Sequence, residues 1–77
     1  TKIKLENIES DYNMIIKEGI DDLDQTYFNG QLIGSTYGWD VARNYRIPKQ
    51  ILIKGENTIA IRAFDWVGHI PILFLGN

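Results

Sequence analysis

The dipeptide Asn29-Gly30 constrains the fold of this chain more than any other feature of its sequence. Both central residues of a type I′ turn need a positive φ angle, and Asn and Gly tolerate that angle best. A β-prone run at 26–28 precedes the dipeptide, and an apolar return strand is expected to start at 32–33 and to end at Gly34. The sequence therefore predicts a β-hairpin around this turn.

Alternation of apolar and polar residues predicts further strands on both sides of the hairpin. Arg43, Tyr45 and Ile47 share one face of a predicted strand, and Pro48 ends it because proline has no amide to donate to a sheet. The clearest strand covers 58–65. Other strands are expected at 1–5, 14–20 and 70–75, a single helical turn at 49–53, an acidic bend at 21–24, and loops or turns at 6–13, 35–40, 54–57 and 66–69.

This pattern predicts an all-β chain of six or seven short strands, which is typical of a sandwich or a barrel. Seventy-seven residues make at most one small domain, so 1–77 is expected to form a single module. The chain has no cysteine, so disulfides cannot stabilise it. Because it starts at Thr1, we expect a fragment or a processed piece of a larger protein.

Charge and hydropathy argue against two classes of partner. Eight basic and ten acidic residues give a net charge of −2, whereas a nucleic-acid surface needs a concentrated basic patch. No apolar run approaches the roughly 18 residues that a membrane helix needs. We therefore expect neither nucleic acid nor a membrane as a partner.

Three blocks of sequence occur in a familiar order. They are IDDLDQTYFNG at 20–30 with Ile33-Gly34, then Trp39 with Arg43, Tyr45, Ile47 and Pro48, then GENTIAIR at 55–62 with Asp65. Together they resemble the galactose-binding-like jelly-roll domain of bacterial sialate O-acetylesterases. The sugar-binding jelly rolls of family 2 glycoside hydrolases are similar more weakly, through their Asn-Gly and Gly-x-Asn turns. The resemblance covers Gly19 to about Gly68, and the acidic block is its specific part.

The resemblance implies a galactose-binding-like β-sandwich that is incomplete here. The family's domain is larger, with upstream strands for which only 1–13 is available, and it tends to be rich in glycine where this chain has Trp-Val-Gly-His at 66–69. The implied function is that of a non-catalytic accessory module, without cofactor, packing on the catalytic domain of a bacterial periplasmic or secreted esterase and contributing to sugar binding. Two alternatives stay open: a structural jelly roll of a glycoside hydrolase, and a free-standing carbohydrate-binding module.

The sequence offers no catalytic centre. A catalytic triad needs a serine, a histidine and an acid within hydrogen-bond reach of one another. The candidates are Ser10, Ser35 and the single histidine, His69, and neither serine sits in a Gly-x-Ser-x-Gly elbow. The nucleophile and base of the resembling esterases would lie outside this segment.

The acidic cluster Asp21, Asp22 and Asp24 needs something to offset its own repulsion. Carboxylates bind calcium, but the spacing does not match an EF-hand loop. Arginine pairs with carboxylates in a bidentate way and can fix the geometry between strands. We favour such pairing over a metal site, with Arg43 and Arg62 as the first candidates and Arg46 as a third.

Three aromatic residues, Tyr37, Trp39 and Trp66, are predicted to lie in loops, where binding residues concentrate. Loop aromatics can stack on the C–H face of a pyranose ring, so these three are candidate sugar-binding residues. The alternative is that Trp39 and Trp66 close the ends of a small core, since each large aromatic buries about 150 to 250 Å². The closing role is favoured for Trp39, and the two roles are balanced for Trp66.

A jelly roll cut from a larger protein is expected to expose unpaired strand edges. Such edges invite pairing with another chain. The segments 3–5 and 70–75 are the expected sites of self-association.

Overall fold

The computed structural model describes residues 1–16, 23–38, 41–63 and 72–76, and for residues 72 and 73 it describes the backbone alone. These residues form seven strands and one short 3₁₀ helix. In chain order they are β1 (Lys2–Leu5), β2 (Tyr12–Ile16), β3 (Leu23–Phe28), β4 (Gln31–Tyr37), β5 (Arg43–Ile47), η1 (Lys49–Ile51), β6 (Gly55–Ala63) and β7 (Ile72–Gly76). The prediction of an all-β chain is confirmed.

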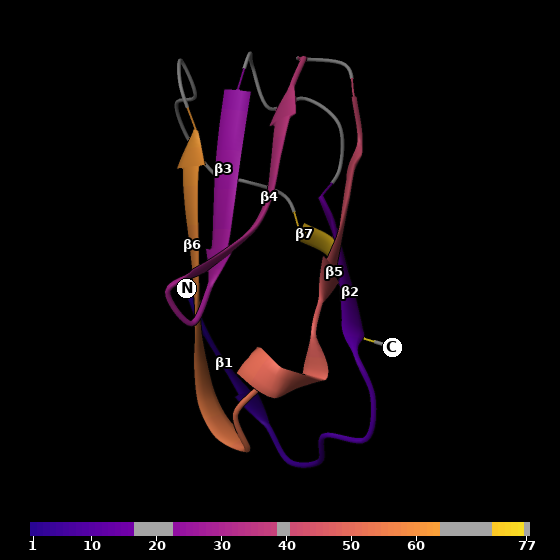
Figure 1. The fold of residues 1–77 in the computed structure, drawn as a ribbon, viewed down its shortest axis with the longest axis vertical. Coiled ribbons are helices and arrows are strands. Elements are labelled where there is room, and N and C mark those ends of the chain that lie inside the picture. The colour runs from indigo at the N-terminus through magenta and orange to yellow at the C-terminus, as the bar shows by residue number, and fades with distance from the viewer. Residues whose placement is uncertain (17–22, 39–40, 64–71, 77) are drawn as a thin grey trace.

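The strands form two antiparallel sheets that face each other as the layers of a small β-sandwich (Figure 1). One sheet has the order β1-β6-β3-β4 and the other the order β5-β2-β7. Both sheets contribute to one core, which consists of Met14, Ile16, Phe28, Tyr45, Ile47, Leu52 and Ile59. Burying these side chains is the main favourable term that holds the layers together.

The predicted hairpin is present between β3 and β4. Asn29 has a φ angle of 50° and Gly30 one of 80°, and Phe28 pairs directly with Gln31 across the turn. Positive φ at both central residues is what a type I′ turn requires. The alternation predicted for β5 is also confirmed, because Arg43, Tyr45 and Ile47 are buried while the two residues between them are exposed.

Several predicted boundaries are wrong. The return strand does not end at Gly34, because β4 continues to Tyr37 and takes in three residues predicted as a loop. β3 begins at Leu23, so Asp24 lies in a strand instead of a bend. β6 begins at Gly55, inside the turn predicted at 54–57. In each case pairing with a neighbouring strand overrides the local preference of Gly, Ser, Asn or Asp for turns.

Side-chain hydrogen bonds of two asparagines fix the end of the sandwich near η1. The Asn57 side chain is fully buried; its Nδ2 donates to the carbonyl oxygens of Ile53 (2.7 Å) and Gly55 (3.0 Å). Asn29 Nδ2 donates to Asn57 Oδ1 (2.9 Å) and to the Ile51 carbonyl (2.6 Å). The turn residues of two of the resembling blocks therefore have a structural role here.

The outer strands are β1 and β4 in one sheet and β5 and β7 in the other. The segments in which exposed edges were predicted thus supply two of these edge strands, β1 and β7. Among the described residues, no helix is both long enough and apolar enough to cross a membrane.

Candidate functional site

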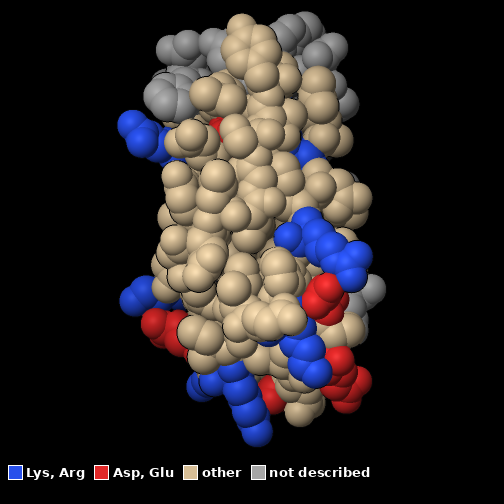
Figure 2. Space-filling view, in the orientation of Figure 1, with Lys and Arg blue, Asp and Glu red and all other residues tan. Residues whose placement is uncertain are grey.

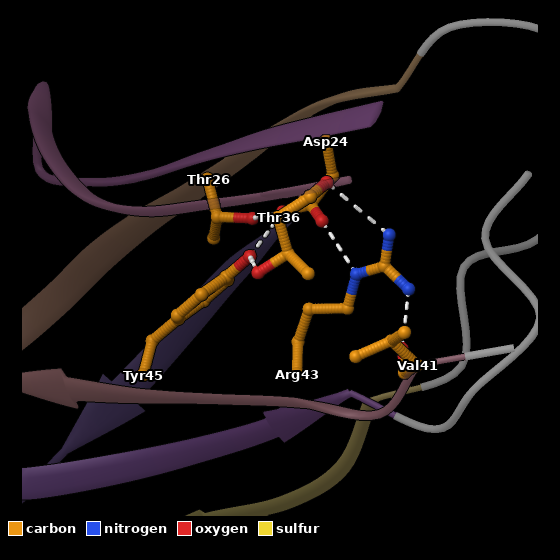
Figure 3. A network of polar contacts seen from close by, with 6 residues as sticks. All are labelled: Asp24, Thr26, Thr36, Val41, Arg43 and Tyr45. Carbon is orange, nitrogen blue, oxygen red and sulfur yellow. Dashed lines mark hydrogen bonds and ion pairs between the residues drawn. The ribbon is translucent and has the colours of Figure 1, made fainter. Parts of the chain in front are cut away.

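A buried polar network joins the two sheets at the end of the sandwich opposite η1 (Figure 3). Asp24 is the second residue of β3 and Arg43 is the first residue of β5, so one charge comes from each sheet. Arg43 Nε donates to Asp24 Oδ1 at 2.6 Å, and both side chains are 0% exposed. Removing either partner would leave an uncompensated charge inside the protein.

The second carboxylate oxygen of Asp24 is also satisfied. Oδ2 accepts from Thr26 Oγ1 (2.9 Å) and from the Tyr45 hydroxyl (2.7 Å). An ionised carboxylate only accepts hydrogen bonds, so the phenol proton points to Asp24. Thr36 Oγ1, 2.7 Å from the phenol oxygen, is then the donor in that contact. Every side chain of this network has its orientation fixed by another.

Burial raises the pKa of the Tyr45 phenol to about 12. Desolvation is the largest cause, because it penalises the phenolate, and the hydrogen bond to the Asp24 carboxylate adds to it. The hydroxyl of Thr36 and the charge of Arg43 act in the opposite direction. Tyr45 is therefore a neutral hydrogen-bond donor at any physiological pH.

Gly34 makes room for the Tyr45 ring. A Cβ atom at Gly34 would lie 2.2 Å from Tyr45 Cδ1 and 2.3 Å from Cε1. Gly34 pairs with Thr26 and Thr36 pairs with Asp24, so all four residues share the inner face of the β3–β4 ladder. The absent side chain at Gly34 thus allows the Tyr45 hydroxyl to reach Asp24.

The Arg43 guanidinium also holds both ends of the β4–β5 connection. Nη2 donates to the Thr36 carbonyl at 3.3 Å, and Nη1 donates to the Val41 carbonyl (Figure 3). Thr36 lies one residue before the end of β4, and Val41 lies two residues before β5. One buried side chain therefore binds the backbone both at the end of β4 and just before the start of β5.

Two apolar side chains are exposed where this connection meets the surface. Tyr37 ends β4 and is 76% exposed, and Val41 is 42% exposed. Val41 packs closely on Gly38, since a Cβ atom there would lie 2.9 Å from Val41 Cγ2. We call Tyr37, Gly38 and Val41 the loop platform.

Among the residues that the structure describes, β4 carries no charged side chain beside the loop platform. β4 contains no Asp, Glu, Lys or Arg, and Leu32 near its start is 55% exposed. Figure 2 shows that the middle of the face in view, over β4, is formed by uncharged residues, with most charged groups toward the η1 end. An aromatic ring on a neutral surface suits contact with an uncharged, partly apolar ligand.

The predicted site residues are only partly brought together. Of the acid–arginine cluster, Asp24 and Arg43 meet. Arg62 lies on β6, opposite Gln25 in the β3–β6 ladder, and its predicted pairing with Asp21 or Asp22 stays a prediction. Arg46 binds Asp11 instead, at 2.7 Å. Tyr37 is the last residue of a strand and not a loop residue. Four further predicted residues lie outside the described part of the chain: Asp21, Asp22, Trp39 and Trp66.

The described residues show no arrangement for nucleophilic or metal chemistry. Ser35 lies in the middle of β4 and Ser10 is exposed in the β1–β2 connection, so neither occupies a strand-to-helix elbow. His69 lies outside the described residues. Within 1–16, 23–38, 41–63 and 72–76, no group of three His, Cys, Asp or Glu side chains could hold a metal ion.

Three members of the network were missed by sequence reasoning: Thr26, Thr36 and Tyr45 as a hydrogen-bond donor. The alternation of Asp24, Thr26 and Phe28 was a usable signal, since all three are buried. Thr36 had no such signal.

The chain matches no protein-family model, no curated protein and no solved structure.

Proposed function

We propose that this chain is a non-catalytic β-sandwich module of a carbohydrate-active, sialate O-acetylesterase-like enzyme. It packs on the catalytic domain of the parent protein and presents Tyr37 to carbohydrate. The galactose-binding-like jelly roll is part of this proposal, supported by the resembling blocks and by the two-sheet β-sandwich.

The single observation that carries the sugar-contact role is the exposure of Tyr37. Burying an aromatic ring stabilises a small domain, yet this ring is 76% exposed, beside the partly exposed Val41. Loops and strand ends on a rigid scaffold are where binding residues concentrate. A ring held at this place can stack on the C–H face of a pyranose without moving any part of the core.

The accessory role is supported by the partners of the buried polar side chains, which are groups of this chain. Asp24 and Arg43 are fully buried, and their hydrogen bonds go to groups of this chain. A carboxylate that acts as a general base must reach the proton that it abstracts. The network therefore builds the scaffold, and the chemistry belongs to another domain.

The test is titration of the chain with a panel of monosaccharides, including methyl galactoside, methyl xyloside and N-acetylneuraminic acid. We expect Tyr37→Ala to weaken binding about tenfold, the loss of one aromatic contact. Tyr27→Ala is the matched control, because Tyr27 lies on the outer face of β3 near the Asn29-Gly30 turn, at the end of the β3–β4 ladder away from the loop platform. Equal binding by Tyr37→Ala and the unmodified chain would overturn the sugar-contact role.

A second measurement tests the accessory role. The isolated chain should not hydrolyse an acetylated model substrate such as 4-nitrophenyl acetate above the uncatalysed rate. Turnover that disappears in Ser35→Ala or His69→Ala would refute the proposal and place the catalytic centre in this chain.

A further inference from the structure

We propose that Arg43 is the positioning residue for the loop platform. Its guanidinium, held by Asp24, binds both ends of the β4–β5 connection and so, together with the pairing of Tyr37 with Leu23, holds Tyr37 in place. The link to carbohydrate rests on the function proposed above, whereas the positioning itself does not.

The geometry of the guanidinium supports this role. Nε binds Asp24 Oδ1, while Nη1 and Nη2 bind the carbonyl oxygens of Val41 and Thr36. A guanidinium is planar and presents its donors in a fixed fork, so fixing one donor fixes the direction of the others. The pair with Asp24 therefore directs the two Nη donors at both carbonyl groups.

The two carbonyl groups flank the platform. Thr36 immediately precedes Tyr37, and Val41 packs on Gly38, which immediately follows it. Gly38 has a φ angle of 130°, a backbone conformation open mainly to glycine. Because glycine has no side chain, Gly38 cannot be held by side-chain contacts of its own. The described anchors of this connection are thus Arg43 and the end of the β4 ladder.

Arg43→Lys separates positioning from simple charge. A lysine ammonium can still pair with Asp24, but it is a point charge on a flexible stem and cannot span the two carbonyl groups in a fixed fork. We expect the variant to stay folded, with the backbone order parameters of Gly38, Val41 and Ala42 falling from near 0.85 to below about 0.6. We also expect its affinity for the bound monosaccharide to fall about tenfold.

Two controls distinguish positioning from loss of stability. Arg46→Lys changes the neighbouring exposed arginine of β5, which binds Asp11, and should leave the platform rigid. Ile59→Val removes one buried methylene from β6 and lowers the melting temperature without touching the β4–β5 connection. If Ile59→Val lowers the three order parameters as much as Arg43→Lys does, Arg43 acts only through stability and the proposal fails.

The outcomes separate this proposal from the proposed function. Order parameters that are unchanged in Arg43→Lys, or already low in the unmodified chain, overturn the positioning role. A mobile platform in Arg43→Lys together with unchanged sugar binding by Tyr37→Ala supports positioning and refutes the carbohydrate role. If both proposals hold, Tyr37→Ala combined with Arg43→Lys should weaken binding no more than Tyr37→Ala alone, because the two act through the same contact.

Discussion

Replacing Gly34 by alanine should destabilise the protein, although strand propensity predicts the opposite. Glycine inside a strand is less favourable than alanine by about 0.5 to 1 kcal/mol, because it loses more backbone freedom on folding. At Gly34, however, the new methyl group would lie 2.2 to 2.7 Å from three atoms of the Tyr45 ring. The ring must move, and the Tyr45 hydroxyl is bound to Asp24 and Thr36.

The expected cost follows from these contacts. Overpacking a core costs about 1 to 3 kcal/mol, and a hydrogen bond to a charged acceptor contributes about 1.5 to 3 kcal/mol. After the gain in propensity is subtracted, Gly34→Ala should lower the free energy of unfolding by about 2 to 5 kcal/mol. A 77-residue chain has about 4 to 12 kcal/mol in total, so the loss is large and measurable.

The assay is urea unfolding followed by circular dichroism, with Ser35→Ala as the matched control. Ser35 is the next residue of β4 and its side chain is exposed, so that change should stay within about 0.5 kcal/mol of the unmodified chain. In a Tyr45→Leu background the ring is absent, and Gly34→Ala should cost much less than in the unmodified chain. A Gly34→Ala variant as stable as the unmodified chain would refute the close packing of Tyr45 on β4.

Three further predictions concern ionisable groups. Asp24→Asn and Arg43→Ala should each cost about 3 to 5 kcal/mol, and the double variant less than their sum; additive losses in urea unfolding would show that the buried pair is not coupled. The pKa of Tyr45 is raised to about 12, so the folded state holds the phenol proton more tightly than the unfolded state does. The stability difference between the unmodified chain and Tyr45→Phe should therefore be complete below pH 10, where the unfolded phenol is still neutral, and decrease from pH 10 to 12; a constant difference across this range contradicts it. The Lys49 backbone amide, followed by the Arg46 side chain, holds the pKa of Asp11 below its ordinary value of 3.8. Its contribution is present above pH 3.8 and lost as pH falls through the folded pKa, so Asp11→Asn and the unmodified chain should differ at pH 6 and converge in acid; a difference that persists at low pH argues against the Asp11 contacts.

Local sequence patterns predicted the scaffold of this fold well. Asn29-Gly30 predicts the hairpin because few other residues accept its φ angles, and alternation in β5 predicts a shared face for Arg43, Tyr45 and Ile47. These signals depend only on neighbours in the chain. Strand ends were predicted less well, since the extension of β4 to Tyr37 comes from pairing with Leu23 and not from its own composition.

The partners of Asp24 could not be read from the chain in this way. Counting from the two-residue turn, an uninterrupted ladder would place Ser35 opposite Asp24. A bulge at Ile33 shifts the register, so that Thr36 lies there instead and Gly34 lies opposite Thr26. Choosing Arg43 among three candidate arginines likewise depends on how two sheets stack, which the sequence of either strand does not contain.

The hydrogen bonds of Asn29 have a consequence for the chemical durability of the protein. In an Asn-Gly peptide the glycine nitrogen readily attacks the asparagine side chain, releasing ammonia and leaving aspartate or isoaspartate after hydrolysis. In the folded chain, Asn29 Nδ2 donates to two oxygens and Oδ1 accepts from the Thr58 amide, so its carboxamide is held in one orientation. Aspartate at this position would turn a carboxylate toward the Ile51 carbonyl and Asn57 Oδ1, both acceptors. The dipeptide that shapes the hairpin is therefore also a site of irreversible damage: a molecule that stays unfolded for long can deamidate at Asn29, and the product no longer fits the folded hairpin.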